Sequence, residues 1–456
     1  YDNRYFVEAS MRYDGSDNFP KDHRWGTFYS GSIGWSLADE AFMETIREKH
    51  IFDMLKIRAS YGQVGLDNWG NDGDTYHIGR FAYLTSYGLG GQEYVMNGEY
   101  VPGFWEGSLP SPDLTWFTTD QFDAGFDFSS LNNRLYGSFD YFYYATKGFL
   151  YAPDALDVGY TDPLGVSLPK ISTDGEHRRA GVEFQLGWRD DIGDFHYDVA
   201  FNFTKFDELW ANNPSESLEN KKNPYKRTTQ QRGYAGVYYE NMGFYKDAND
   251  VYNSVQRTGS HSLTAGDLKY YDFNGDGVID GADQHRLGKS SFPRANYGLN
   301  INLSYKGFSF STLFQGATRF DMYLGSVLMM SDANTGSSPT YEFQTDYWTP
   351  ENTDAKFPRL LSSTGNNGSN NTVGSDFWLI NGGYLRMRDI QVGYDFKRIL
   401  LKKTSWITRL NVALSGQNIF TISEATKYGI DPENGSANRY DYPNERVFAI
   451  NFGIGF

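Results

Sequence analysis

The run Val447-Phe-Ala-Ile-Asn-Phe-Gly-Ile-Gly-Phe456 alternates strictly between two kinds of side chain. Because successive side chains of a β-strand point to opposite faces, the run predicts a strand with one apolar face and one small or polar face. The apolar face carries Phe448, Ile450, Phe452, Ile454 and Phe456. The other face carries Val447, Ala449, Asn451, Gly453 and Gly455.

The same alternation recurs along the chain, in residues 181–188, 195–204, 297–305 and 409–417. The polar positions are rich in Gly, Ser, Asn and Ala, and the apolar positions include Tyr and Phe near the strand ends. A soluble sandwich turns its apolar face inward and usually places Lys, Glu and Thr on the face that meets water. The observed pattern therefore favours a membrane barrel, with an apolar face toward lipid and a polar lumen.

The spacing of the alternating runs predicts an all-β fold, a transmembrane antiparallel β-barrel, over residues 1–456. Short connections alternate with long ones, as expected for periplasmic turns and extracellular loops, and the C-terminus falls on the periplasmic side. The expected strands are 3–13, 26–37, 54–64, 120–128, 133–147, 177–188, 195–207, 295–305, 308–319, 383–396, 406–419 and 446–456. The main extracellular loops are expected at 65–119, 148–176, 208–294, 320–382 and 420–445.

One expected strand departs from the pattern. In residues 384–394 the apolar phase slips around Arg386, Arg388 and Asp389. A β-bulge, which adds one residue to a strand, shifts the phase in this way. We therefore expect either a bulge at these residues or a strand end that projects beyond the membrane.

The composition excludes several classes of protein. The chain has 41 Lys and Arg against 57 Asp and Glu, for a net charge of −16, which argues against a nucleic-acid partner. It has no Cys, so disulfides, thiolate metal sites and cysteine nucleophiles are absent from this sequence. No stretch approaches the length of about 18 consecutive apolar residues that a transmembrane helix requires.

An ordered series of short blocks resembles the C-terminal half of the SusC/RagA-type TonB-dependent transporters of Bacteroidetes. Each block is weak alone, but together they span nearly the whole chain in the family's order. The early blocks are Asp14-Gly-Ser16, Arg24-Trp-Gly26, Gly34-Trp-Ser36 and Leu55-Lys-Ile-Arg-Ala-Ser-Tyr-Gly62. The later blocks are 266–280, Arg286-Leu-Gly288 with Pro293, 384–394, Gly416-Gln-Asn-Ile-Phe420 and Tyr428-Gly-Ile-Asp-Pro-Glu433.

The resemblance implies a barrel of roughly 22 strands, of which this chain supplies about twelve. The plug domain and the TonB-binding segment of the family lie N-terminal to this region and are not present in the sequence. The implied function is TonB-dependent import of oligosaccharides or peptides across the outer membrane of a Gram-negative bacterium. The implied partners are outer-membrane lipid, TonB acting through the plug, and a SusD-like surface lipoprotein, with a possible dimer of transporter–lipoprotein pairs.

Two alternatives remain at this stage. The first is a self-contained outer-membrane barrel of about twelve strands, with or without enzyme activity, in which strand 3–13 pairs with strand 446–456. The second is a soluble calcium-binding, carbohydrate-active β protein. It requires Phe448, Phe452 and Phe456 to be buried against protein.

The segment Asp272-Phe-Asn-Gly-Asp-Gly-Val-Ile-Asp-Gly-Ala-Asp283 follows the pattern of a calcium-binding loop. Oxygen ligands are expected at loop positions 1, 3, 5, 7, 9 and 12, with Gly at position 6. Hard oxygen donors with several carboxylates favour Ca²⁺, here in a structural role that braces the loop. A metal-free acidic turn is the alternative. The candidate ligands are Asp272, Asn274, Asp276, Val278, Asp280 and Asp283.

The remaining loop sequence contains no catalytic motif. None of the seven histidines forms HExxH or a close pair, and there is no GxSxG and no P-loop, so we expect no enzyme activity. Residues 40–50 are expected to form a short helix, residues 233–246 ordered strands, and the Asn-rich residues 365–371 a mobile tip. The loop tryptophans either stack on sugar rings or pack the loops; they are Trp69, Trp105, Trp116, Trp210 and Trp348.

Overall fold

The computed structural model describes residues 1–68, 78–107, 109–151, 169, 171–325, 341–361, 364–397, 406–434 and 444–456. The chain divides into two compact units. Unit 1 comprises Tyr1–Phe184 and Phe206–Arg232, and unit 2 comprises Gln185–Lys205 and Gly233–Phe456. Strands β8 and β9 contribute residues to both units.

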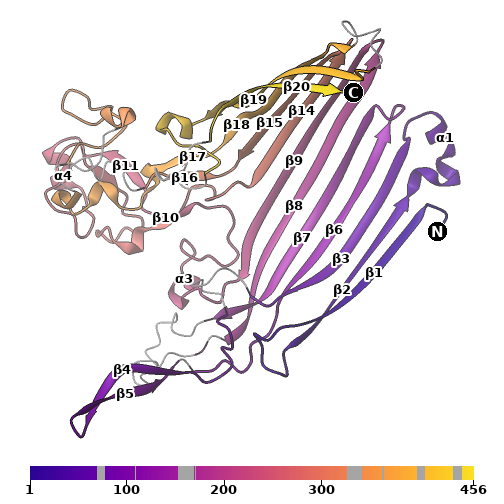
Figure 1. The fold of residues 1–456 in the computed structure, drawn as a ribbon. Coiled ribbons are helices and arrows are strands. Elements are labelled where there is room, and N and C mark those ends of the chain that lie inside the picture. The colour runs from indigo at the N-terminus through magenta and orange to yellow at the C-terminus, as the bar shows by residue number, and fades with distance from the viewer. Residues whose placement is uncertain are drawn as a thin grey trace. The chain divides into compact units, whose positions relative to one another are not determined.

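The twelve predicted long strands are all present and belong to one sheet, in the order β1-β2-β3-β6-β7-β8-β9-β14-β15-β18-β19-β20 (Figure 1). Strands β1 and β20 stand at the two ends of this order, whereas a self-contained barrel requires them to pair. Six of these twelve long strands begin in unit 1, namely β1 Tyr5–Gly15, β2 Trp25–Ser36, β3 Met54–Leu66, β6 Phe117–Ser130, β7 Leu135–Tyr151 and β8 Ile171–Ile192. The others are β9 Phe195–Asn212, β14 Ala295–Tyr305, β15 Phe308–Thr318, β18 Tyr384–Asp395, β19 Arg409–Ser423 and β20 Val447–Gly455.

The connections in unit 1 add a few short elements. The helix predicted in residues 40–50 is confirmed as α1, Glu44–Glu48, preceded by the 3-10 turns η1, Leu37–Asp39, and η2, Ala41–Met43. A hairpin of β4, Tyr87–Met96, and β5, Glu99–Glu106, extends away from the long strands of this unit (Figure 1). Helix α3 spans Leu218–Lys222. A small apolar core beside the strand ends consists of Phe19, Ile78, Leu114, Phe117, Phe149 and Leu150.

The connections of unit 2 fold into what we call the loop module, residues 236–287, 321–325, 341–361 and 364–381. It contains three two-stranded sheets, β10-β13, β11-β12 and β16-β17, together with α4, so the strands predicted within residues 233–246 are confirmed (Figure 1). Its fully buried side chains include Trp378 and Leu268. The bounds are β10 Gly236–Tyr238, β11 Asn241–Phe244, α4 Ala248–Asn253, β12 Leu268–Tyr270, β13 His285–Leu287, β16 Asp321–Tyr323 and β17 Leu379–Asn381. The 3-10 turns of unit 2 are η4 Gly281–Asp283, η6 Glu342–Thr345, η7 Thr364–Asn367, η8 Asn370–Thr372, η9 Asp376–Trp378 and η10 Ala425–Tyr428.

The prediction that residues 365–371 form a mobile tip is wrong. Asn367 and Asn371 are buried in the loop module and donate side-chain hydrogen bonds to Asp267 Oδ1, at 3.0 and 2.9 Å. Asp267 has no exposed surface, and its Oδ2 accepts from Arg359 Nη2 at 3.0 Å. The Asn side chains are therefore structural hydrogen-bonding groups, because a buried carboxylate requires several donors.

The two faces predicted from the alternation are confirmed in the terminal strand. Phe448, Phe452 and Phe456 are 74%, 72% and 80% exposed. A soluble β protein would bury these rings, so the second alternative is contradicted. Lys306 and Gly307, both with positive φ, form the two-residue turn between β14 and β15. No helix among the described residues is both long and apolar enough to cross a membrane.

The bulge expected in residues 384–394 is present. Leu313 of β15 lies opposite Asp389 and the next residue, Phe314, lies opposite Met387, so Arg388 is an extra residue in β18. In the pairing of β18 with β19 the register also shifts between Met387 and Asp389. This shift lies next to Asn418 of β19, which has a φ of 53°. The bulge corrects the phase, because Met387 and Ile390 can then both lie on the apolar face.

Candidate functional site

Unit 1 carries a cluster of charges on the polar face of its strands. Arg58 of β3 lies between three carboxylates that come from the two following strands of the sheet. Its Nη1 is 3.2 Å from Asp123, its Nε is 3.1 Å from Asp127 and its Nη2 is 2.7 Å from Asp140. Gly125 leaves space for the carboxylate of Asp140, since a Cβ at position 125 would lie 2.1 Å from Asp140 Oδ1. One cation against three anions leaves this part of the face with an excess of negative charge.

Unit 2 has a different polar face. Asn300 and Asn302 of β14 lie there, and both are exposed. Ser311 pairs with Asn302, and Gln391 pairs with Ser311, whereas on its other side Asn302 pairs with Asp198 of β9. Neutral amides and hydroxyls can both donate and accept hydrogen bonds. This face therefore offers hydrogen bonds from neutral groups, with the carboxylates of Asp198 and Asp389 among them.

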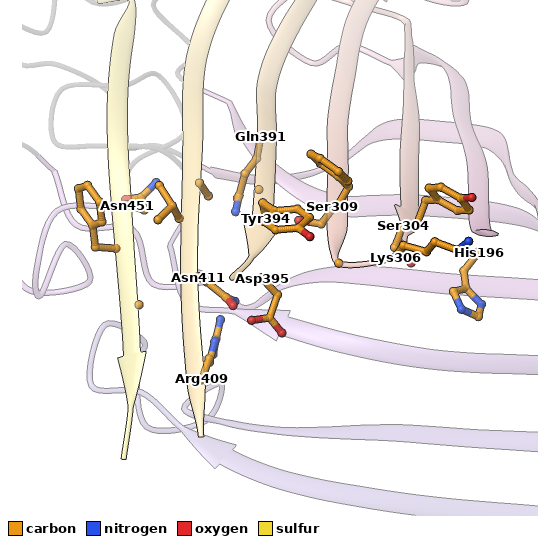
Figure 2. Close-up of a pocket in the computed structure, with 18 of the residues that line it drawn as sticks. His196, Ser304, Lys306, Ser309, Gln391, Tyr394, Asp395, Arg409, Asn411 and Asn451 are labelled. Carbon is orange, nitrogen blue, oxygen red and sulfur yellow. The ribbon is translucent and has the colours of Figure 1, made fainter. Parts of the chain in front are cut away.

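A cavity of about 460 Å³ opens at the short-turn end of this face (Figure 2). Its wall includes Ser309, Gln391 and Asn451 from neighbouring strands, and charged residues such as Lys306 and Asp395 stand at the turns. The cavity belongs entirely to unit 2. The polar face of unit 2 thus ends in a concave, hydrogen-bonding surface with a charged rim.

Aromatic side chains cluster on the opposite, apolar side of the same strand ends. Phe308 packs against Tyr394 with ring centroids 4.3 Å apart, and Trp406 stacks on Phe456 at 6.0 Å. Tyr305 lies at the end of β14 in the same zone. Aromatic rings of this kind form the belts found where a membrane protein meets the lipid headgroups.

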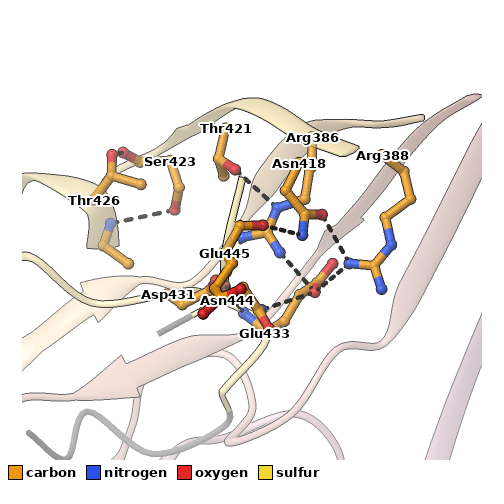
Figure 3. A network of polar contacts seen from close by, with 11 residues as sticks. Arg386, Arg388, Asn418, Thr421, Ser423, Thr426, Asp431, Glu433, Asn444 and Glu445 are labelled. Atoms are coloured by element: carbon orange, nitrogen blue, oxygen red, sulfur yellow. Dashed lines mark hydrogen bonds and ion pairs between the residues drawn. The ribbon is translucent and has the colours of Figure 1, made fainter. Parts of the chain in front are cut away.

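At the other end of the sheet, two arginines of the bulged strand hold the connection that follows β19 (Figure 3). Arg386 is only 3% exposed, and it donates to Asp431 at 2.6 Å and to Glu433 at 2.7 Å. Arg388 donates to the same Glu433 oxygen and to Asn418 Oδ1, both at 3.1 Å. Three of the sequence blocks that carried the family resemblance meet in this network.

The network sets the ionisation of Asp431. Partial burial alone would raise the pKa of this carboxyl group, but the net effect is a pKa below its ordinary value. The causes are the backbone N–H of Glu433, the guanidinium of Arg386 and the amide of Asn444, which all donate to Asp431. Asp431 is therefore held as the charged partner of Arg386.

The six candidate calcium ligands lie together in one loop, with β12 before it and η4 at its end. Asp272 accepts backbone hydrogen bonds from Gly275 and Gly277 at 2.8 and 2.9 Å. In the same way, the side-chain oxygens of Asn274, Asp276 and Asp280 each accept a hydrogen bond from the backbone N–H group two residues further along the chain. These bonds fix the loop, and each carboxylate retains acceptor sites, because an ionised carboxylate offers about four.

Asp283 differs from the other five. It is fully buried, and its two oxygens accept from the backbone N–H groups of Phe273, Asn274 and Asp280 at 2.7–3.2 Å. In the part of the chain that the structure describes, no three His, Asp or Glu side chains converge in a metal-holding group. The expected set relies also on Asn274 and the carbonyl of Val278, so the calcium site stays a prediction.

Most of the described loop tryptophans pack against protein. Trp210 contacts Phe149 with ring centroids 4.7 Å apart, and Trp116 packs on Phe19 at 5.2 Å. Trp348 lies against Gly266, where a Cβ would be 2.4 Å from its ring. Trp105 in the β4–β5 hairpin is 45% exposed. Trp69 lies outside the described residues.

A large antiparallel sheet with a polar face, an apolar face and an aromatic zone at its short-turn ends is typical of an outer-membrane barrel protein. Residues 1–314 match the family described as "TonB dependent receptor-like, beta-barrel", and the chain belongs to this family. Such receptor barrels are outer-membrane proteins, and the predicted location is confirmed.

Named relatives give the resemblance its detail. The chain is 27% identical over 472 residues to the TonB-dependent receptor SusC of Bacteroides thetaiotaomicron, covering all of this chain and 42% of SusC. It is 27% identical over 481 residues to the TonB-dependent receptor P3 of Formosa agariphila, covering 44% of that receptor. Among solved structures, the chain is similar to the RagAB peptide importer in its open-open state, with a TM-score of 0.76 and 19% identity. The match covers all of this chain and 45% of the RagAB chain. The predicted relation to SusC and RagA is confirmed, and the chain spans less than half the length of these proteins.

Sequence reasoning missed the Arg58 cluster. The alternation placed Arg58 and Asp123 on the polar positions of their strands, and this was the available signal. The sequence alone does not show that β3 pairs with β6 and that β6 pairs with β7. These pairings set Ser60 opposite Asp123 and Gly125 opposite Asp140.

Proposed function

We propose that this chain is the C-terminal part of a SusC-like TonB-dependent importer that takes up oligosaccharides or peptides across the outer membrane. The polar face of the sheet lines the transport path, and the apolar face meets lipid. The observation that carries the proposal is the strand-by-strand separation of these faces in a chain of this receptor family.

The loops define the outer side of the proposed importer. Short turns, such as Lys306-Gly307, lie at one end of the strands, and the connections that form the loop module leave from the other. In outer-membrane barrels the short turns are periplasmic and the long loops extracellular. The loop module and the Arg386 network then lie at the entrance, and the 460 Å³ cavity lies near the exit.

A SusD-like surface lipoprotein is the proposed partner at the entrance, and TonB supplies energy through a plug domain outside this chain. The β4–β5 hairpin supports the first partner, because Leu89, Tyr100 and Phe104 are 85%, 75% and 71% exposed. A two-stranded hairpin is marginally stable alone, and aromatic side chains are enriched at protein interfaces. A dimer of such transporter–lipoprotein pairs is compatible with this arrangement.

The proposed mechanism is binding followed by gated passage, without covalent chemistry on the substrate. It is tested with the complete receptor in its native outer membrane. Deletion of the gene that carries this sequence should abolish energy-dependent uptake of one class of labelled oligosaccharides or peptides, and detergent extraction should co-purify a lipoprotein. Unchanged uptake of every class in the deletion strain would refute the import function.

We also propose that residues 272–283 bind one Ca²⁺ ion that braces the loop module. The donor chemistry supports this, since five of the six residues offer side-chain oxygen and Gly277 occupies the sharp turn with a φ of 81°. The test is a calcium titration of the complete receptor, followed by proteolysis of the loop. Protection that saturates with Ca²⁺ and is lost in Asp272→Ala, but not in the exposed control Asp247→Ala, is expected. No effect of Ca²⁺ or of a chelator would refute it.

A further inference from the structure

An aromatic pair stands at each end of the apolar face of β1 and β2. Tyr13 stacks on Trp25 with ring centroids 5.0 Å apart, and Tyr5 stacks on Trp35 at 6.5 Å. They share this face with apolar residues such as Ile33, which is 61% exposed. From Tyr5 to Tyr13, β1 advances by eight residues (13 − 5), which is roughly 20 Å along the membrane normal for a strand tilted by about 40°. The apolar band of an outer-membrane barrel is about 25 Å tall, so the two pairs lie near its two edges, where aromatic belts occur.

The pair at the short-turn end is bonded to the connection between β2 and β3. Glu40 in this connection accepts a hydrogen bond from the Tyr5 hydroxyl and another, of 3.0 Å, from Trp35 Nε1. Arg4 Nη1 lies 3.4 Å from the second carboxylate oxygen of Glu40. Tyr and Trp at a membrane interface keep their rings in the apolar layer and their polar tips at its wet edge. The Glu40 carboxylate therefore lies on the lipid-facing side of the strand ends, at the level of the headgroups.

Residues 37–53, which we call the foot, contain α1 and are held at both ends (Figure 1). The carboxylate described above ties the first part of the foot to β1 and β2. Asp39 accepts a hydrogen bond from Arg47 Nη1 at 3.0 Å, which closes the foot on itself. At the other end, the backbone N–H of Leu131 in the β6–β7 turn donates to the carbonyl of His50 at 2.7 Å. The position of the foot at the short-turn end of these strands is therefore fixed.

One large apolar side chain of the foot points away from the strand ends. Phe42 is 67% exposed, whereas Met43 and Ala38 of the same segment are 9% and 1% exposed. The two buried side chains pack the foot against the protein. Phe42 follows Glu40 by two residues, so their Cα atoms are at most about 7 Å apart. A phenyl ring so close to the headgroup level is stabilised when it leaves water for the apolar layer.

The charge of the foot selects the kind of lipid. Residues 39–50 carry two cations against four anions, a net charge of −2 (2 − 4) with His50 neutral. These residues are Arg47 and Lys49 against Asp39, Glu40, Glu44 and Glu48. Segments that bind anionic lipids are polybasic, because the negative surface potential attracts Lys and Arg. An acidic foot gains nothing from that attraction, so its contact with lipid rests on apolar area.

We propose that the foot rests on the inner leaflet of the outer membrane and inserts Phe42 into a zwitterionic phospholipid surface. The short-turn end of the strands is the periplasmic end, so the leaflet next to the foot is the inner one. The bonds from Tyr5 and Trp35 to Glu40 set the height of the foot. The phenyl ring enters the boundary between headgroups and acyl chains by about 5–10 Å. The contact fixes the depth of this end of the receptor in the membrane, and it goes beyond the proposed import function.

The test uses the complete receptor in intact cells, with the photoreactive analogue benzoylphenylalanine in place of Phe42. Two further variants carry the same group at Ile33, on the lipid-facing side of β2, and at Asp194, which is 52% exposed in the β8–β9 turn. After illumination, the mass of the modified receptor fragment reports what the group has reached. We expect a phospholipid adduct at positions 42 and 33 and none at position 194.

A second set of variants tests the anchor and the lipid class. Added to the position-42 variant, Glu40→Ala should reduce the phospholipid adduct toward the level at position 194, because the foot loses its bonds to the aromatic pair. Glu48→Ala, the loss of an exposed carboxylate of α1, should leave the adduct unchanged. In vesicles of purely zwitterionic phospholipid, the purified receptor should give the same yield as in vesicles that also contain anionic phospholipid.

Three results overturn the proposal. An adduct at position 42 with another polypeptide, or with another segment of the receptor, means that protein covers the ring. No adduct at position 42, beside a phospholipid adduct at position 33, means that the ring faces water. An adduct at position 42 that forms only with anionic phospholipid means that charge governs the contact. Equal adduct in the Glu40→Ala and Glu48→Ala variants overturns the assigned role of Glu40 alone.

Discussion

Replacing Arg386 by methionine removes the cation that ties the connection after β19 to the bulged strand. Arg386 is 3% exposed, and its two carboxylate partners, Asp431 and Glu433, are 14% and 19% exposed (Figure 3). Removal of one partner from a buried ion pair costs about 3–5 kcal/mol, because the remaining charge stays buried without compensation. In this variant Glu433 retains its ion pair with Arg388 at 3.1 Å. The expected loss of stability is therefore near the lower limit of this range, at about 3 kcal/mol.

The assay is hydrogen exchange of residues 424–434 in the detergent-solubilised receptor, read by mass spectrometry. A loss of about 3 kcal/mol corresponds to a local opening that is roughly a hundredfold more frequent. Arg388→Met is the matched control. Arg388 is 40% exposed and Glu433 keeps Arg386, so the control should cost less than about 1 kcal/mol. Equal exchange in both variants, or none beyond the parent, would refute the assigned role of Arg386.

Three further predictions follow from the loop regions. Asp267→Ala should destabilise the loop module by about 3–5 kcal/mol and expose it to protease, whereas Asp354→Ala on its surface should not. Because the pKa of Asp431 is lowered on folding, its contribution is complete above the unfolded value of about 3.9 and is lost as the pH falls through the lower folded pKa. The protection of residues 424–434, which is the exchange rate divided into the intrinsic rate at the same pH, should thus be constant from pH 5 to about 8 and fall only in stronger acid; a fall already at pH 6 would contradict this. Chelation of Ca²⁺ should loosen residues 272–283 in the parent but not in Asp272→Ala, and equal loosening in both would contradict the site.

The strands and their faces could be predicted from the sequence because alternation is a local property. Each of the twelve predicted strands has a counterpart in the sheet, and the phase slip at Arg388 marked the bulge correctly. These features depend only on which side chains follow one another along a strand.

The parts that failed depend on distant pairings. Residues 365–371 have the composition of a flexible loop, yet Asn371 reaches Asp267, which is 104 positions away. The Arg58 cluster joins residues up to 82 positions apart. A single sequence contains no record of these distances, so burial of Asn side chains and convergence of charges are visible only after the strands are paired. The calcium loop is different, because its residues are adjacent in the sequence and the local pattern was enough to identify the candidate ligands. The pattern does not show whether these residues hold a metal.

Two adjacent residues of β20 report whether one face of the sheet meets water in a lumen and the other meets lipid. Asn451 and Phe452 point to opposite faces, and this sequence has no cysteine of its own. Asn451→Cys and Phe452→Cys are labelled separately in intact outer membranes, with a hydrophilic maleimide and with a lipid-soluble one. We expect the hydrophilic reagent to modify only position 451 and the lipid-soluble reagent to prefer position 452. Hydrophilic labelling of position 452 at the rate of position 451 would contradict it.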